Sequence, residues 1–134
     1  MGLVNGFGFK TACAVASTEA HDCHQLVVVG TAEEDMAIAA NTLAQIGGGQ
    51  IVVREREVIA LLELPIAGLM SGESAGVVAR KAHEINNGFQ LCGCQISNPN
   101  MPLSFLALAV IPDLRLTDKG LVDVNRFDFI PLVG

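Results

Sequence analysis

Residues 25–49 read QLVVVGTAEEDMAIAANTLAQIGGG, and this stretch decides the fold. Residues 25–29 form a continuous apolar run, which is typical of a central strand that is covered on both faces. Thr31 and Glu34 have the spacing of a capping box, which predicts that a helix begins here. Its wide apolar face continues to about residue 46. Residues 47–49 are three glycines, which end a helix readily.

Working outward, the remaining elements follow from short apolar runs and breakers. Residues 11–17 alternate loosely between small and β-branched side chains, which predicts a strand. Residues 51–53 and 58–62 flank the polar residues Arg54-Glu55-Arg56-Glu57, which predicts a β-hairpin, although the turn has no Gly or Asn. The other expectations are an apolar connection over 64–70, a helix over about 73–87 ended by Gly88, a short buried helix over 102–109, and an extended tail over 121–131 that can return to the sheet.

This order of elements predicts an α+β fold with a single mixed or antiparallel β-sheet and helices packed on it. The chain has 134 residues, which is enough for one domain. Hydrophobic residues make up 51% and charged residues only 16%, against a usual charged share of about 25%. Part of the surface is therefore expected to meet another domain or a second copy, as in a homo-oligomer.

Charge and apolar patterning exclude several classes of protein. The net charge is −6 and Trp and Tyr are absent, so nucleic-acid binding is not expected. The longest apolar stretch, residues 58–70, is interrupted by Glu63 and Pro65 and is shorter than the roughly 20 residues of a membrane span. The N-terminus lacks the pattern of a signal peptide, and four cysteines are too few for a disulfide scaffold. We expect no membrane partner and a cytoplasmic location.

The segment His21-Asp22-Cys23-His24 is the sharpest candidate for chemistry. Imidazoles and a carboxylate are good ligands for zinc, manganese or iron, so His21, Asp22 and His24 form a candidate metal site. If the following strand extends back this far, Asp22 and His24 share one face, whereas on a loop all four side chains can converge. The alternative is structural: the histidines cap strand ends and Asp22 makes a turn bond.

The pair Cys92 and Cys94 is weaker evidence for a metal site. Only one residue separates the two cysteines, whereas structural zinc sites favour two to four. Because cysteine is also a common small core residue, we expect both side chains to be buried in the core.

Several stretches in order resemble the C-terminal domain of bacterial adenine deaminases, in the amidohydrolase superfamily. They are Val4-Asn5-Gly6-Phe7-Gly8, Ala20-His21-Asp22-Cys23-His24, Val27-Val28-Val29-Gly30-Thr31 with Glu34-Asp35-Met36, Gly47-Gly48-Gly49, Leu64-Pro65-Ile66-Ala67-Gly68-Leu69-Met70-Ser71, Leu103-Ser104-Phe105-Leu106-Ala107-Leu108 and Leu116-Thr117-Asp118-Lys119-Gly120-Leu121-Val122-Asp123-Val124. The resemblance covers nearly the whole chain. It departs at Cys23, where a serine-like residue is expected, and at the hairpin turn, which lacks the usual Gly.

The resemblance implies that residues 1–134 are the terminal module of an enzyme that hydrolyses adenine to hypoxanthine and ammonia. In that family, catalysis belongs to an upstream metal-binding barrel whose metal centre needs a His-x-His pair. This chain has three histidines and no such pair, so no catalytic residue is assigned here.

Three functional hypotheses follow. The first is an accessory or assembly domain without catalytic activity of its own, in which His21, Asp22 and His24 hold a divalent metal or complete the barrel's pocket from outside. The second is an autonomous metal-dependent hydrolase or purine-binding protein that uses the segment from His21 to His24. The third is an oligomerisation module whose apolar face assembles the enzyme.

Overall fold

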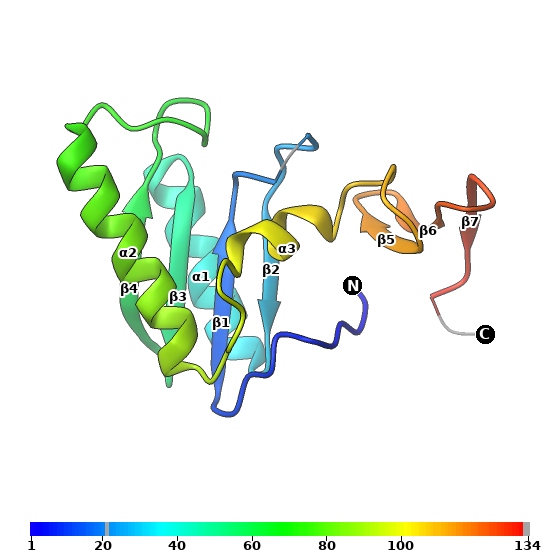
Figure 1. Cartoon of the computed structure of the whole chain (residues 1–134), viewed down its shortest axis with the longest axis horizontal. Helices are drawn as coiled ribbons and strands as arrows, with labels where there is room; N and C mark the ends of the chain where they lie inside the picture. Colours follow the sequence, from blue (N-terminus) through cyan, green and yellow to red (C-terminus); the bar gives the residue numbers. More distant parts are fainter. Residues whose placement is uncertain (21, 133–134) are drawn as a thin grey trace.

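The structure, a computed structural model, describes residues 1–20 and 22–132. The predicted α+β class is confirmed, and all strand pairs are antiparallel. In chain order the elements are β1 (Cys13–Ser17), β2 (Val27–Gly30), α1 (Glu33–Ile46), β3 (Gly49–Arg54), β4 (Glu57–Glu63), α2 (Ala75–Leu91), α3 (Asn100–Phe105), β5 (Leu114–Thr117), β6 (Gly120–Asp123) and β7 (Asp128–Ile130). The strands form two sheets rather than the expected single one (Figure 1).

The first four strands form the main sheet, in the order β2-β1-β3-β4. Helix α1 packs on one face, where Leu43 meets Ile51 and Val53, and α2 packs on the other, where Ile85 and Phe89 meet Val52. Strands β1 and β3 are central, and every residue of β1 is buried. The main sheet is therefore a layer that is covered on both faces by helices of this chain.

The prediction of a central strand at residues 25–29 is wrong, because β2 lies at an edge of the main sheet. Its four residues are only half-buried. The apolar run still has a physical reason, since Val27 and Val29 pack on the core under α2 while Val28 packs on the core under α1. A strand that is covered on both faces reads as continuously apolar whether it is central or not.

Helix α1 ends as predicted but begins differently. Gly47 caps its C-terminus with a left-handed φ of 87°, and the Gly47 N–H donates to Leu43 O. The expected capping box is not formed: the N-cap is Ala32, without a side-chain cap hydrogen bond. The Thr31 hydroxyl instead donates to Thr11 O at 2.7 Å. Thr31 therefore fastens the start of β1 rather than the helix.

The predicted hairpin between β3 and β4 is confirmed. Its two turn residues, Glu55 and Arg56, have φ values of 53° and 70°. Positive φ at both positions is the geometry of a two-residue hairpin turn, which here forms without glycine. The buried carboxylate of Asp35 accepts the Arg56 N–H at 2.8 Å. This bond ties the turn to the first turn of α1.

Helix α2 runs past Gly88, so the predicted stop at that residue is wrong. A Cβ added at Gly88 would lie 3.0 Å from Val52 Cγ2. The absence of a side chain at Gly88 therefore allows α2 to approach β3 closely. This position needs glycine for packing and not to end the helix. Helix α3 covers Asn100–Phe105 rather than the predicted residues 102–109.

The tail does not return to the main sheet, contrary to expectation. Strands β5, β6 and β7 pair only with one another, in that order, and form a second, small sheet. It stands to one side of the main sheet, beyond α3 (Figure 1). The Leu116 N–H donates to Leu106 O at 3.0 Å and links β5 to the segment after α3. Within residues 1–20 and 22–132, no helix has the length and apolarity needed to cross a membrane.

Candidate functional site

The segment around Asp22 and His24 is a turn between β1 and β2. His21 lies outside the described residues. Strand β2 begins only at Val27, so the segment is a loop rather than an extension of the strand. Asp22 and His24 are exposed, and His24 has a φ of 46° and donates its backbone N–H to Ala20 O at 2.6 Å. This geometry presents both side chains at the surface.

Cys23 is exposed but contacts a distant segment of the chain. Its Sγ donates to Ala107 O at 3.0 Å, across 84 positions of sequence. This contact anchors the turn to the segment that follows α3. Among the described residues, no three His, Cys, Asp or Glu side chains are grouped so that they could hold a metal ion. The metal site of His21, Asp22 and His24 therefore stays a prediction.

A polar pocket of about 230 Å³ lies at the same end of the main sheet. Its lining combines the end of β1, the start of β3 and the region of α3, through Glu19, Gln50, Asn98, Asn100, Met101 and Ser104. The Gln50 Nε2 donates to Glu19 Oε2 at 2.8 Å, and the Ser104 hydroxyl donates to Glu19 O at 3.0 Å. Gln50 is only 7% exposed, and its Oε1 has no hydrogen-bond partner among the described atoms.

Sequence reasoning missed this polar pocket because its residues come from segments far apart in the chain. One signal was present: Gln50 directly precedes the apolar run of β3. A buried amide at such a position needs partners, since an unpaired buried carbonyl is costly. The carboxamides of this pocket are suited to polar groups that both donate and accept hydrogen bonds.

Three of the four cysteines lie in the core, as predicted for Cys92 and Cys94. The pKa of Cys13 is lowered to about 7, chiefly because the Cys92 thiol donates a hydrogen bond to it, with Thr31 and Thr11 adding to the effect against the opposing cost of burial. The same hydrogen bond, together with burial, raises the pKa of Cys92. Cys13 and Cys92 therefore act as one buried thiol pair.

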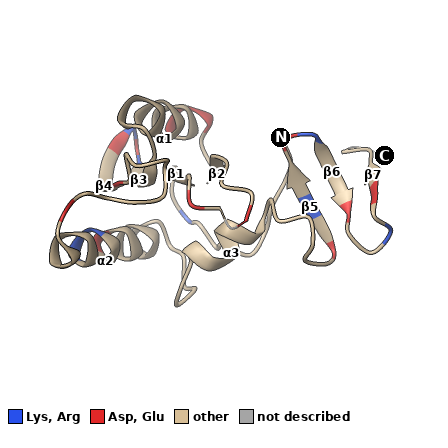
Figure 2. Ribbon diagram, turned by 90° about the horizontal axis from the view of Figure 1, so that it is seen from above, with Lys and Arg blue, Asp and Glu red and all other residues tan. Residues whose placement is uncertain are grey.

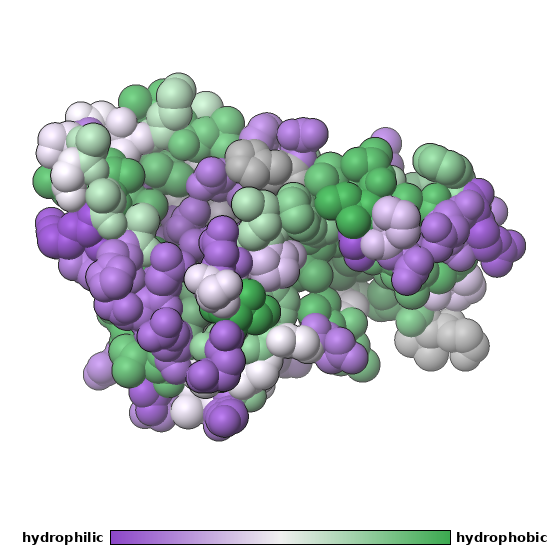
Figure 3. All heavy atoms as spheres, in the orientation of Figure 1, coloured by the Kyte–Doolittle hydropathy of each residue, from purple (hydrophilic) through white to green (hydrophobic). Residues whose placement is uncertain are grey.

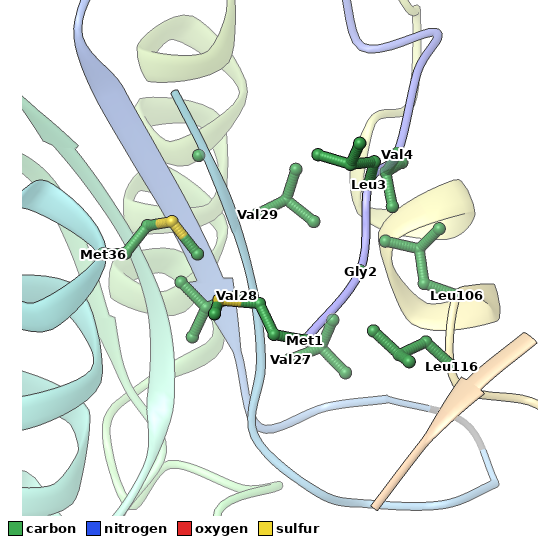
Figure 4. A pocket seen from close by; sticks show the side chains of 11 residues that line it. Met1, Gly2, Leu3, Val4, Val27, Val28, Val29, Met36, Leu106 and Leu116 are labelled. Atoms are coloured by element: carbon green, nitrogen blue, oxygen red, sulfur yellow. The ribbon is translucent and has the colours of Figure 1, made fainter. Parts of the chain in front are cut away.

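A second hollow, which we call the apolar cleft, lies between the N-terminal segment and the small sheet. It measures about 290 Å³ and is lined by Gly2, Leu3, Val4, Leu106, Leu114, Leu116, Leu121 and Leu132. An adjoining pocket of about 190 Å³ continues it toward β2 (Figure 4). In that view, Leu3, Val4, Leu106 and Leu116 lie on one side of the pocket, opposite the valines of β2.

Charge is absent from the lining of the apolar cleft, whereas residues 113–128 over the small sheet carry seven charged side chains. Residues 1–9 and 85–112 contain no Lys, Arg, Asp or Glu. Figure 2 shows α3 without a charged residue, and Figure 3 shows apolar side chains gathered where the segment after α3 meets the small sheet. An exposed apolar hollow of this kind marks a site of interaction with another surface.

The comparisons with known proteins agree on one family. The family model of the adenine deaminase C-terminal domain matches residues 1–128. The adenine deaminase of Paracoccus denitrificans is 52% identical over 132 residues, which are 98% of this chain and 22% of that protein. Adenine deaminase 3 of Rhizobium meliloti is 51% identical over 94% of this chain, and the adenine deaminase of Moorella thermoacetica is 50% identical over 99%. The chain spans about a fifth of the length of these relatives.

Proposed function

The chain belongs to the family of adenine deaminase C-terminal domains, and we propose that it serves as the accessory domain of an adenine deaminase. In this proposal the domain packs on the rest of the enzyme and has no deaminase activity of its own. The reaction, in which water converts adenine to hypoxanthine and ammonia, takes place in the part of the enzyme that this chain does not contain. We also propose a cytoplasmic location and assembly as a homo-oligomer.

The observation that carries the proposal is the coverage of the relatives. Nearly all of this chain, 98%, corresponds to 22% of the Paracoccus denitrificans enzyme. About four fifths of such an enzyme is therefore other sequence. That length is ample for a catalytic domain such as a (β/α)8 barrel, which takes roughly 250 residues.

The test uses a chimera in which the matched fifth of the Paracoccus denitrificans enzyme is replaced by this chain. We expect the chimera to release ammonia from adenine at a rate close to that of the parent enzyme. We expect the 134-residue chain alone to release none. Ammonia release by the isolated chain, at a rate proportional to its concentration, would contradict the proposal.

We further propose that His21, Asp22 and His24 hold a divalent transition metal, either zinc, manganese or iron, or complete the catalytic pocket from outside. Two imidazoles and a carboxylate suit these metals. A bound metal would supply a Lewis acid. The contribution of this chain is to present Asp22 and His24 on an exposed turn that Cys23 anchors through Ala107 O.

Metal content per chain tests this assignment. The protein purified without chelator is expected to carry one transition metal, and the double variant His21→Ala/His24→Ala is expected to lose it. His83→Ala is the matched control, because His83 is an exposed histidine on α2. Equal metal content in the wild type and the double variant would remove the assignment.

A second candidate function, purine binding by the chain itself, is supported by the polar pocket. The buried Gln50 Oε1 without a partner offers an acceptor to an amino group. Carboxamides pair well with the edge of adenine. Calorimetric titration of adenine into the chain is expected to give heat that is lost in Asn98→Ala, a substitution of an exposed residue of the polar pocket. No heat with the wild-type chain would eliminate this candidate.

A further inference from the structure

The register of the small sheet sorts its side chains into two unlike faces. Leu116 pairs with Leu121, and Leu121 pairs with Ile130, so an apolar row crosses all three strands. Leu114 lies on the same face, two residues before Leu116, and its own row continues through Asp123 and Asp128 at the edge of the sheet. The opposite face carries the row Arg115, Val122 and Phe129. The first face is therefore apolar in its central row and at Leu114, and its leucines Leu114, Leu116 and Leu121 line the apolar cleft.

This apolar face is only partly covered within the chain. Residues 2–4 lie against it, and a Cβ at Gly2 would be 3.3 Å from Leu116 Cδ2. Even so, no residue of β5, β6 or β7 is fully buried. Leu114 remains 46% exposed and Leu132 51%. Three strands need a packed apolar face for stability, so this face is incomplete without further protein.

The N-terminal segment is also left largely uncovered by the rest of the chain. Leu3 is fully exposed and Met1 is 93% exposed, although both lie at the edge of the hollow between β2 and the small sheet. The family model of the C-terminal domain matches this chain from residue 1, so in a whole adenine deaminase the preceding polypeptide would join the segment at residues 1–4. That polypeptide therefore reaches this domain directly beside the apolar cleft (Figure 4).

The length of the relatives and the uncharged lining of the apolar cleft indicate which partner occupies the cleft. About four fifths of each relative lies outside the region that this chain matches. The lining of the apolar cleft has no charged side chain, which suits an apolar segment of protein rather than an ionic ligand. We infer that the apolar cleft is the surface on which this domain docks the preceding, catalytic part of an adenine deaminase. This inference rests on the proposed function and assigns its contact surface.

Hydroxyl-radical labelling of side chains tests the assignment, with the isolated chain compared with the chimera described above. Met1, Leu114 and Leu132 are expected to lose reactivity several-fold in the chimera. Met70 and Val58, which are 58% and 44% exposed on the main-sheet side, are the matched controls and are expected to keep theirs.

The labelling outcomes separate the two proposals. Loss of reactivity at Met70 and Val58, with Leu114 and Leu132 unchanged, would place the contact elsewhere; it would overturn this inference and leave the accessory role standing. Unchanged reactivity at every position would contradict both proposals, because the domain would then touch nothing in the enzyme.

Substitutions in the chimera provide the second measurement. Leu3→Asp removes no internal packing, since the side chain is fully exposed, and Leu114→Asp alters a half-exposed position of β5. Each is expected to raise the rate of proteolytic cleavage between the two parts by about tenfold, as for a central interface residue. Val58→Asp, at a position of nearly equal exposure on β4, is expected to leave the rate unchanged. Equal rates in all three variants would overturn the inference.

A second copy of this chain is the competing occupant. Sedimentation of the isolated chain at micromolar concentration is expected to give the same molecular mass for the wild type and Leu3→Asp. A wild-type dimer that Leu3→Asp converts to monomer would assign the apolar cleft to self-association and overturn docking of the catalytic part.

Discussion

The main sheet and the small sheet are both antiparallel, but only the main sheet is covered by its own chain. Helices α1 and α2 cover its two faces, and all five residues of β1 are buried. The small sheet has the segment at residues 2–4 on one face, and none of its strand residues is fully buried. We therefore expect the main sheet to be stable through contacts of this chain alone, and the small sheet to depend more on contacts with further protein.

Charge distinguishes the apolar cleft from both sheets, since residues 113–128 over the small sheet carry seven charged side chains. Around the main sheet, Arg56 pairs with Glu34, and Lys81 pairs with Glu63 and Glu73. Beside the apolar cleft, residues 1–9 and 85–112 carry no charged side chain. Because solvated surfaces carry charge while interfaces lose it toward their centres, the lining of the apolar cleft is the part suited to burial in a larger protein, and the charged turns of the small sheet suit its rim.

The largest expected effect is a difference in local opening between the two sheets. In the isolated chain, amides of β1 and β3 are expected to exchange only on global unfolding, and those of β5, β6 and β7 through local opening. The two sets should differ by about 5 kcal/mol in opening free energy. Hydrogen exchange resolved by residue measures both. Equal protection of the two sheets from exchange would contradict the difference in packing between them.

Two phenylalanines allow the packing of the two sheets to be compared with the same substitution. Phe89 is 1% exposed under the main sheet, and Phe127 is 84% exposed in the turn before β7. Phe89→Ala is expected to lower the free energy of unfolding by about 3–5 kcal/mol, because it leaves a cavity. Phe127→Ala is expected to change it by less than about 0.5 kcal/mol. Urea unfolding measures both, and a cost at Phe127 as large as at Phe89 would mean that the small sheet has its own core.

Sequence patterns predicted the main sheet well because its signals are local. The apolar periodicity of α1, the left-handed Gly47 and the two apolar runs of the hairpin each depend on neighbours in the chain. The edge position of β2 could not be predicted, since strand order depends on contacts between distant segments. The predicted end of the helix at Gly88 is wrong for a related reason, because the role of this glycine depends on its close approach to Val52 in another element.

The candidate site was predictable only in part. The segment from His21 to His24 draws attention because its ligand-type side chains are consecutive in sequence. The polar pocket and the apolar cleft are assembled from segments that sequence alone does not place together: Gln50 meets Glu19 across 31 positions. The register that puts Leu116, Leu121 and Ile130 in one row required the strand pairing.

The buried thiol pair predicts a pH dependence on the main-sheet side. Cys13 has a pKa of about 7 in the folded chain against an ordinary 9.0, so the free energy of unfolding rises as pH rises from about 7 to 9 and is lost as pH falls through 7. The rise is on the order of 2 kcal/mol, at about 1.4 kcal/mol per pKa unit. Above the ordinary value the raised pKa of Cys92 reverses the slope, because only the unfolded chain then releases that proton. Stability is therefore greatest near the ordinary thiol pKa.

Urea unfolding over this pH range tests the thiol pair. Cys92→Ala removes the hydrogen-bond donor and is expected to flatten the rise, whatever its effect on absolute stability. Cys94→Ala is the matched control, since Cys94 is equally buried in the same core, and its slope should equal that of the wild type. A steep rise that persists in Cys92→Ala would exclude the pair as its source.

The smallest expected effect comes from the ion pairs of Lys81, which join α2 to β4 and to the segment before α2. Lys81 Nζ lies 2.6 Å from Glu63 and 2.8 Å from Glu73, and its hydrogen bond lowers the pKa of Glu63. A lowered carboxyl pKa stabilises the fold above the ordinary value, and this stabilisation is lost as pH falls through the lowered one.

Lys81→Met therefore should be slightly less stable than the wild type at neutral pH and equal to it in acid, with a gap that narrows at high salt. Arg80→Met, which breaks the exposed pair with Glu84 on the same helix, is the control and should show a smaller gap. A gap that persists in acid would mean that Lys81 acts through the packing of its aliphatic stem rather than its charge. In either case the contact fastens α2 to the main sheet. Among the described residues, no ion pair joins a helix to β5, β6 or β7, so removal of a charge from the small sheet of the isolated chain should change its stability less.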